Sequence, residues 1–206
     1  MLISKSMEQV IRVLLNKKSV KLRELAKEAN VPLSLAVKNT NALEKSKYIE
    51  KKVNIHVISQ IKLLKAWAYT TSIREIDKIE FSAAERPQFI IKKIANILSR
   101  NNVKYAFTLF SALEVLSPYV TPAETHLYIL EKDQEKVKKL FEKESILPAQ
   151  KGNAVCFLVN DNYFYNMQNI QGFNIISTPQ LYVDLFSYGG RGEDAAQHLL
   201  EVVKNV

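Results

Sequence analysis

Hydrophobic residues recur at helical spacing in three segments near the N-terminus. This spacing predicts helices over residues 7–15, 22–29 and 33–46. Pro32 separates the last two, because proline disfavours helical geometry in the residue before it but is tolerated in the first turn of the helix that follows. Residues 48–50 and 53–59 are β-branched and partly alternating, which predicts two short strands. The order is therefore helix, helix, turn, helix and β-hairpin.

This order resembles the winged helix-turn-helix family, and the segment that carries the resemblance covers residues 24–52, ELAKEANVPLSLAVKNTNALEKSKYIEKK. The resemblance implies a DNA-binding domain over residues 1–60, in which the second helix of the motif enters the major groove. We expect a linking helix over residues 60–71, within a connection that spans residues 61–80.

Helices and strands alternate in the rest of the chain. The pattern predicts strands over 104–108, 125–130 and 154–159, and helices over 87–100, 111–117, 134–143, 179–186 and 193–203. Alternation of this kind is typical of an α/β domain with a mixed sheet, which we expect over residues 81–206. The fold class of the whole chain is thus α+β or α/β, and 206 residues suffice for two modest domains.

The net positive charge is confined to the first third of the chain. Residues 1–62 contain 13 lysines and arginines against 5 acidic residues, a net charge of +8, whereas residues 63–206 contain 16 of each. This asymmetry indicates a polyanionic partner for the N-terminal part, and we expect double-stranded DNA. Two alternatives stay open, namely that the lysines are only a solvated surface, or that the winged helix contacts protein.

The second helix of the motif has a candidate base-reading face. Aligning it through Leu43 turns Ala36, Thr40 and Leu43 inward. Lysine donates to guanine, asparagine pairs with adenine, and branched apolar side chains contact the thymine methyl group. The residues that we expect to read bases are Ser34, Leu35, Val37, Lys38 and Asn41.

A second set of residues is better suited to phosphate contacts, which supply affinity without sequence choice. Lysine predominates in it, and lysine acts as a point charge on phosphate. The set comprises Lys17, Lys18, Lys21, Arg23, Lys45, Lys51 and Lys52. His56, on the expected wing, is interpreted as a structural residue or a phosphate contact.

A glycine-rich turn separates the last two predicted helices. Gly189, Gly190 and Gly192 surround Arg191, and glycine permits a sharp reversal. Glu193 begins the next helix with negative charge, which the helix dipole favours. Arg191 could bind an anion or clamp a carboxylate such as Asp184, and we favour the clamp.

The same region resembles the AbiEi family of transcriptional regulators, the antitoxins of type IV toxin–antitoxin systems. The family pattern is matched at Leu181, Tyr182, Asp184 and Leu185, then over residues 189–196, and again over 198–200, with YAFTLFSALEVLSPYV and THLYIL upstream. The resemblance implies a repressor of its own operon, whose C-terminal domain opposes a nucleotidyltransferase-like toxin.

The element order of the C-terminal part also looks like a degenerate nucleotidyltransferase core. That chemistry needs a glycine–serine turn for phosphates and two carboxylates one residue apart for divalent metal. The turn here is Leu109-Phe110-Ser111-Ala112 and the next strand begins Thr125-His126-Leu127-Tyr128, so we expect no catalytic residues, no metal and no cofactor. Two alternatives remain open: a divergent nucleotidyltransferase with a DNA-targeting domain, and a winged-helix regulator that senses a small molecule.

The remaining features indicate the location and the partners that we expect for the protein. Cys156 is the single cysteine and is expected in the core, so no internal disulfide forms, and we expect a reducing, cytoplasmic location. Charged residues interrupt every apolar run, so we expect no membrane partner. The sequence leaves the oligomeric state, a dimer included, undetermined.

Overall fold

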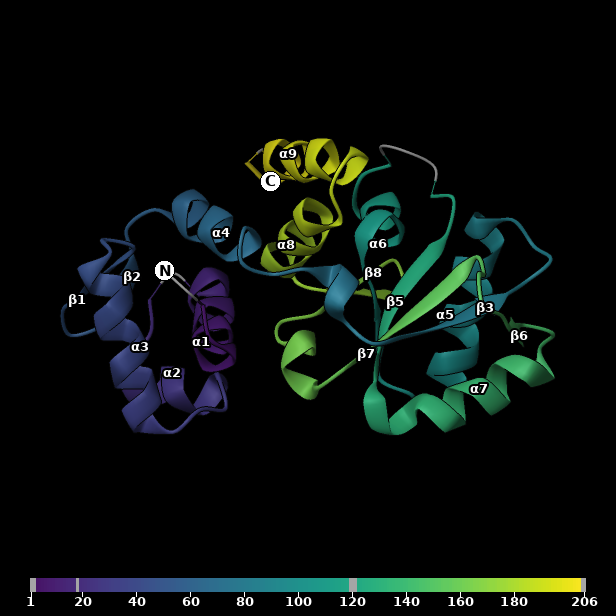
Figure 1. The fold of residues 1–206 in the computed structure, drawn as a ribbon, viewed down its shortest axis with the longest axis horizontal. Helices are drawn as coiled ribbons and strands as arrows, with labels where there is room; N and C mark the ends of the chain where they lie inside the picture. Colours follow the sequence, from purple (N-terminus) through teal and green to yellow (C-terminus); the bar gives the residue numbers. More distant parts are fainter. Residues whose placement is uncertain (1–2, 18, 119–121, 205–206) are drawn as a thin grey trace.

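The computed structural model describes residues 3–17, 19–118 and 122–204, without the side chains of residues 203 and 204. Its N-terminal elements are α1(Lys5–Asn16), α2(Leu22–Glu28), α3(Leu33–Lys45), β1(Ile49–Lys51) and β2(Ile55–Val57) (Figure 1). The three predicted helices and the hairpin are therefore confirmed, with ends shifted by a few residues. Residues 48, 53, 54, 58 and 59 fall outside the two strands.

Local chemistry explains where these elements begin and pair. The Ser4 hydroxyl caps α1 by accepting from the Met7 amide. Asn30 adopts a left-handed conformation with φ 51°, which reverses the chain before α3 begins. Val20 exchanges backbone hydrogen bonds with Ile55, so the link between α1 and α2 pairs with the hairpin. This third pairing was not predicted.

Helix α4(Gln60–Ala68) connects the two parts of the molecule. It ends three residues before the predicted end, and its Trp67 is fully buried. Figure 1 shows α4 reaching from the hairpin to α8(Thr178–Tyr188), and α4 contacts both α1 and α8. The hydrophobic core consequently continues from α1 through α4 into the sheet-containing part.

A mixed sheet forms the C-terminal part, as predicted. Within the described residues it has seven strands. Their order across the sheet is β6(Leu147–Pro148), β3(Lys78–Ser82), β7(Ala154–Val159), β5(Thr125–Leu130), β4(Tyr105–Phe107), β9(Phe173–Ile175) and β8(Gln168–Ile170). The β5–β7 and β4–β9 pairs are parallel, and the others are antiparallel. Cys156 is buried in β7, as expected.

Four strands escaped prediction, namely β3, β6, β8 and β9. The last three have two or three residues each, too few to show an alternating pattern. Strand β3 is longer, but it begins at Lys78, inside the expected connection, and pairs with β7 near the middle of the sheet. Its residues alternate between polar and apolar, so the strand signal was present in the sequence and was overlooked.

Helices cover the two faces of the sheet unequally. Helices α5(Pro87–Arg100) and α7(Gln134–Lys143) pack on one face, where the rings of Phe81 and Phe141 lie 4.9 Å apart. On the other face, α8 lies against β4 and β5, since Asp184 accepts a hydrogen bond from Tyr128. Helices α6(Leu109–Leu116) and α9(Arg191–Lys204) pack against α8. No helix in the described ranges is long and apolar enough to cross a membrane.

The glycine-rich turn makes the reversal between α8 and α9, as predicted. Gly189 and Gly190 have φ values of 78° and 55°. Positive φ values of this size are unfavourable for residues that have a Cβ atom. Gly192 has a different role, because a Cβ on it would lie 2.2 Å from the carbonyl oxygen of Leu185. Glycine there allows the two helices to approach closely.

Two alanine substitutions separate these roles. Gly192→Ala should lower the free energy of unfolding by about 3 kcal/mol, since backbone atoms must move. Gly190→Ala has open space around its Cβ and should cost only about 1 kcal/mol, for its left-handed backbone. Urea unfolding of both variants measures the difference, and equal losses would contradict the close-approach role of Gly192.

Candidate nucleic-acid interface

The predicted base-reading residues lie together on one exposed face of α3. Ser34, Leu35, Val37, Lys38 and Asn41 are all exposed. The opposite face is held inside the molecule by the residues Ala36, Thr40 and Leu43, which have no solvent exposure. The inward and outward sides of α3 are therefore as predicted, whereas contact of these residues with DNA stays a prediction.

One buried polar residue of α3 bonds to another helix, and a second bonds within α3. Asn39 is buried and donates from Nδ2 to the Ser6 hydroxyl at 3.2 Å. The Thr40 hydroxyl donates to the backbone carbonyl of Ala36 at 2.9 Å. Sequence reasoning left Asn39 unassigned, and its amide ties α3 to α1.

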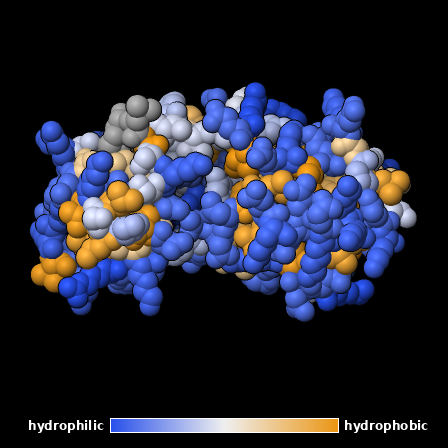
Figure 2. All heavy atoms as spheres, turned by 60° about the horizontal axis from the view of Figure 1, so that its bottom comes forward, coloured by the Kyte–Doolittle hydropathy of each residue, from blue (hydrophilic) through white to orange (hydrophobic). Residues whose placement is uncertain are grey.

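Hydrophobic side chains interrupt the polar surface around this face. Leu33 and Val37 are 44% and 37% exposed, and Val53, at the tip of the hairpin, is 91% exposed. Figure 2 shows such hydrophobic patches on the lobe that the N-terminal elements form, within a mainly hydrophilic surface. Exposed branched side chains beside lysines suit a partner that offers both methyl groups and phosphates.

The predicted phosphate contacts differ in how far they are engaged within the protein. Lys21, Arg23 and Lys45 are exposed and form no ion pair within the described ranges. Lys52 lies 3.2 Å from Glu50, and Lys51 lies 3.2 Å from Glu44. Lys18 lies outside the described residues. His56 is exposed on β2, opposite Glu50.

Lys51 and Lys17 have structural contacts of their own. The ammonium of Lys51 donates to Oδ1 of Asn41, which links the hairpin to the proposed reading face. Lys17 lies 2.6 Å from Glu24 and 2.5 Å from Glu28, and these carboxylates raise its pKa. The charge of Lys17 is therefore largely compensated by the protein itself.

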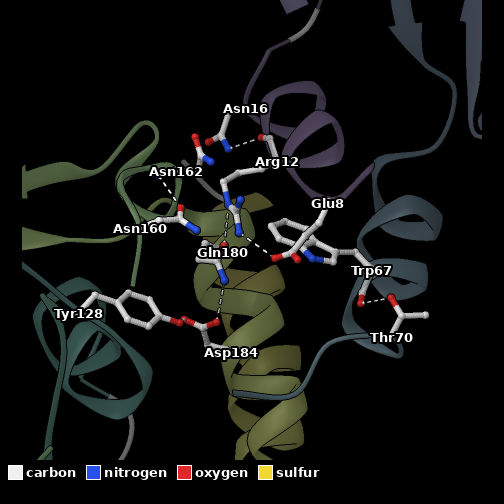
Figure 3. A network of polar contacts seen from close by, with 10 residues as sticks. All are labelled: Glu8, Arg12, Asn16, Trp67, Thr70, Tyr128, Asn160, Asn162, Gln180 and Asp184. Atoms are coloured by element: carbon white, nitrogen blue, oxygen red, sulfur yellow. Dashed lines mark hydrogen bonds and ion pairs between the residues drawn. The ribbon is translucent and has the colours of Figure 1, made fainter. Parts of the chain in front are cut away.

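A buried polar network joins the N-terminal helices to the sheet (Figure 3). Arg12, on α1, is 2% exposed. Its Nε donates to Oε1 of Gln180 at 2.9 Å, and its Nη2 lies 2.9 Å from Glu8. Gln180 in turn donates from Nε2 to Oδ1 of Asp184 at 2.8 Å. The guanidinium also lies 4.7 Å from the ring centroid of Tyr163, a cation–π distance.

Asp184 is the acidic end of this network. Its Oδ2 accepts from the hydroxyls of Thr108 at 2.6 Å and Tyr128 at 2.7 Å. Burial raises the pKa of Asp184 to about 6, and the three donors and Arg12 oppose that rise. Burial and the negative charge of Asp184 raise the pKa of Tyr128. The phenol therefore stays protonated and donates a hydrogen bond to Asp184.

The family comparison covers most of the chain. A family model described as "Transcriptional regulator, AbiEi antitoxin, Type IV TA system" matches residues 56–204. The chain belongs to the AbiEi family. No curated protein and no solved structure matches it.

The AbiEi match begins at His56, on β2, and runs through the sheet to the end of α9. It therefore covers Gln180 and Asp184 but not α1, α2 or α3. The predicted membership of the AbiEi family is confirmed, and with it the class of transcriptional regulators and antitoxins of type IV systems. The candidate reading face rests on its own geometry.

One expectation about the AbiEi motif is wrong. Arg191 does not clamp Asp184, whose hydrogen bonds come from Thr108, Tyr128 and Gln180. Arg191 is exposed at the start of α9, with its guanidinium 5.9 Å from the ring centroid of Phe110. The helix reversal after Tyr188 carries Arg191 away from the carboxylate, which points towards the sheet.

The other AbiEi motif residues have separate positions. Tyr182 is buried on α8, at a ring distance of 6.0 Å from Phe186. Glu193 is exposed in the first turn of α9, where its charge complements the helix dipole. The motif is thus distributed over the core, a turn and the surface.

Sequence reasoning missed Arg12 and Gln180. One signal was available for Arg12, because it lies within the apolar run from Val10 to Leu15 on α1. A charged residue in such a run either ends up exposed or has a buried partner, and the sequence does not show which. One partner, Glu8, is four positions away on α1, but the other, Gln180, is 168 positions away.

Removal of the Arg12 charge tests the importance of the network. Arg12→Met should lower the free energy of unfolding by about 3–5 kcal/mol, because Gln180 and Glu8 lose their donor inside the protein. Arg23→Met removes an exposed arginine and should change it by less than about 0.5 kcal/mol. Chemical denaturation compares the two variants, and similar effects would show that Arg12 contributes no more than a surface residue.

The raised pKa of Asp184 predicts a pH dependence of stability. The unfolded carboxyl group loses its proton near its ordinary pKa, and the folded one only near pH 6, so the folded state holds more protons in between. Raising the pH from 4 to 7 should therefore destabilise the wild type relative to Asp184→Asn by about 3 kcal/mol.

Urea unfolding of both proteins at pH 4 and pH 7 measures this change. The other titrating groups are the same in both proteins, so their contributions cancel in the difference. A difference in unfolding free energy that is equal at the two pH values would contradict the raised pKa.

Proposed function

We propose that this AbiEi-family regulator represses its own operon by binding double-stranded DNA through residues 1–60, folded as a winged helix-turn-helix. Helix α3 enters the major groove and β1 and β2 form the wing. The main support is that all five predicted base-reading residues are exposed on one side of α3, and the opposite side is buried. A helix of this kind presents its outer face to base edges.

Lys38 and Asn41 have the chemistry for sequence choice. Lysine donates to guanine, and the asparagine amide both donates to and accepts from adenine. Lys51 donates to Oδ1 of Asn41 and so orients the amide before DNA binds. Ser34, Leu35 and Val37 face the same major groove of the DNA, and the two apolar side chains contact thymine methyl groups.

Lys21, Arg23, Lys45 and Lys52 provide the phosphate contacts in this proposal. Their charges lie on the part of the chain that has the net charge of +8. Lys17 contributes less, because Glu24 and Glu28 compensate its ammonium group. Affinity should accordingly fall with added salt, as expected for a protein that displaces counterions from DNA.

The C-terminal part has a non-catalytic role in this proposal. We assign residues 61–80 to the connection and residues 81–206, with β3, to a nucleotidyltransferase-like domain that opposes a toxin of the same system. The strand on which a catalyst would carry paired carboxylates begins Thr125-His126-Leu127-Tyr128, without a carboxylate. The phenol of Tyr128 is already bonded to Asp184 in the core.

A comparison of variants on selected DNA tests the reading face. Binding sites are first selected from a random duplex library by the wild type. Lys38→Ala and Asn41→Ala should each lose about 1–3 kcal/mol on the selected site and relax the choice at one base pair. Lys21→Ala and Lys52→Ala should weaken binding to all sequences alike and reduce the salt slope by about 1 each.

Fluorescence anisotropy and repeated selection measure these effects. Lys139→Ala serves as the control, because this exposed lysine lies on α7, in the sheet-containing part. The double variant Lys38→Ala, Asn41→Ala decides the assignment. If it keeps the affinity and the sequence preference of the wild type, α3 does not read the bases.

A further inference from the structure

Among the described residues, no helix covers the part of one sheet face that lies beside α8. Helix α8 covers this face at β4 and β5, where Asp184 meets Thr108 and Tyr128. Beside it, over β3, β7 and the start of β5, the face lines a hollow of about 570 Å³. Its floor is made of alternate strand residues, which point to the same side of a sheet. They are Lys78, Glu80, His126, Val155 and Phe157.

Segments from outside the sheet form the walls of this hollow. Arg74 comes from the turn η1(Ile73–Glu75), and Tyr188 from the last residue of α8, directly before the glycine-rich turn. Gln150 and Lys151 come from the loop between β6 and β7. The hollow has the size of pockets that hold small organic ligands.

The two carboxylates of the hollow are already paired. Glu80 lies 2.7 Å from Lys78, and its other oxygen accepts from the Gly152 amide at 3.0 Å. Glu124 lies 3.3 Å from Nε2 of His126, and this contact is the main reason that its pKa is lowered. Lys78 compensates the charge of Glu80, and Glu124 lies at the edge of the hollow with its carboxylate engaged by His126.

Two further cations are left for a ligand. Arg74 and Lys151 are exposed and form no ion pair within the part of the chain that is described. The Arg74 guanidinium donates to the backbone carbonyl of Tyr188 at 2.6 Å, which holds it at the wall. Arginine and lysine at the edge of a pocket are typical contacts for phosphate.

Aromatic rings form the rest of the surface. His126 and Phe157 are nearly parallel, with ring centroids 6.0 Å apart, and the ring of Tyr188 meets His126 edge-on at 6.1 Å. Tyr188 is half-buried, so part of it faces the hollow. Nδ1 of His126 is buried without a hydrogen-bond partner among the described residues. Flat rings with a nearby polar group suit a heteroaromatic ligand.

We propose that this hollow binds a nucleoside phosphate, with its base against Tyr188 and its phosphates at Arg74 and Lys151. This proposal assigns a class of ligand to the C-terminal part, and it does not depend on DNA binding by α3. It requires no bond to form or break. Arg74 lies in η1, the next element after α4, and α4 contacts α1, so the ligand lies close to the connection between the two parts.

Calorimetry on the full chain without DNA tests this proposal, with ATP and GTP as probes. We expect one site per chain for at least one of them. Adenosine or guanosine, and inorganic triphosphate, should each bind at least about tenfold more weakly than the nucleotide, since each offers half of the contacts. No binding of ATP or GTP overturns the proposal, and so does triphosphate that binds as tightly as the nucleotide.

Two variants locate the site. Lys151→Ala should weaken nucleotide binding about tenfold, and Gln150→Trp should block the hollow from an exposed position without a change in the core. Lys139→Ala is the matched control and should bind like the wild type. Thermal unfolding verifies that each variant is folded. Unchanged nucleotide binding by both Lys151→Ala and Gln150→Trp would place any site elsewhere.

DNA binding by the same variants separates this proposal from the previous one. Lys151→Ala should keep the DNA affinity of the wild type, and Lys38→Ala should keep its nucleotide affinity. Each site can then fail alone.

Discussion

The arrangement of this molecule depends on the hydrogen bonds that the buried guanidinium of Arg12 makes. A charge inside a protein is costly unless other groups replace the water that it loses. Here Glu8, on the same helix, and Gln180, on α8, do so. The side-chain amide of Gln180 makes two hydrogen bonds that fix its orientation. Its oxygen accepts from Arg12, and its nitrogen donates to Asp184. The network therefore joins α1 to the sheet in one orientation.

This connection has a consequence for a regulator of the AbiEi family. A DNA-binding domain on a flexible linker moves independently of the rest of its chain. Here α4 contacts both α1 and α8, and Asn166 donates to Asn16 at 2.9 Å as a further link between the two parts. The two parts are therefore joined by packed helices and hydrogen bonds as well as by the chain itself.

The basic residues of the N-terminal part have two different physical roles. Counting along the chain placed the whole net charge in residues 1–62, and this is correct as a count. The structure shows that some of these charges serve the fold, since Arg12 is buried and Lys17 is paired with two glutamates. The charges available to a polyanion are those on α2, α3 and the hairpin. Net charge therefore indicates a class of partner, and burial selects the residues.

The sequence by itself determined the features that depend on neighbouring residues. Apolar spacing placed α1, α2, α3, α5 and α7 within about two residues of their observed ends, and the glycine turn placed the reversal before Arg191. It also identified the AbiEi family and the exposed side of α3. Tertiary structure alone decided the three shortest strands, β6, β8 and β9, the partners of Asp184 and the burial of Arg12. These depend on residues up to 168 positions apart, and no local pattern records which distant side chain completes a buried charge.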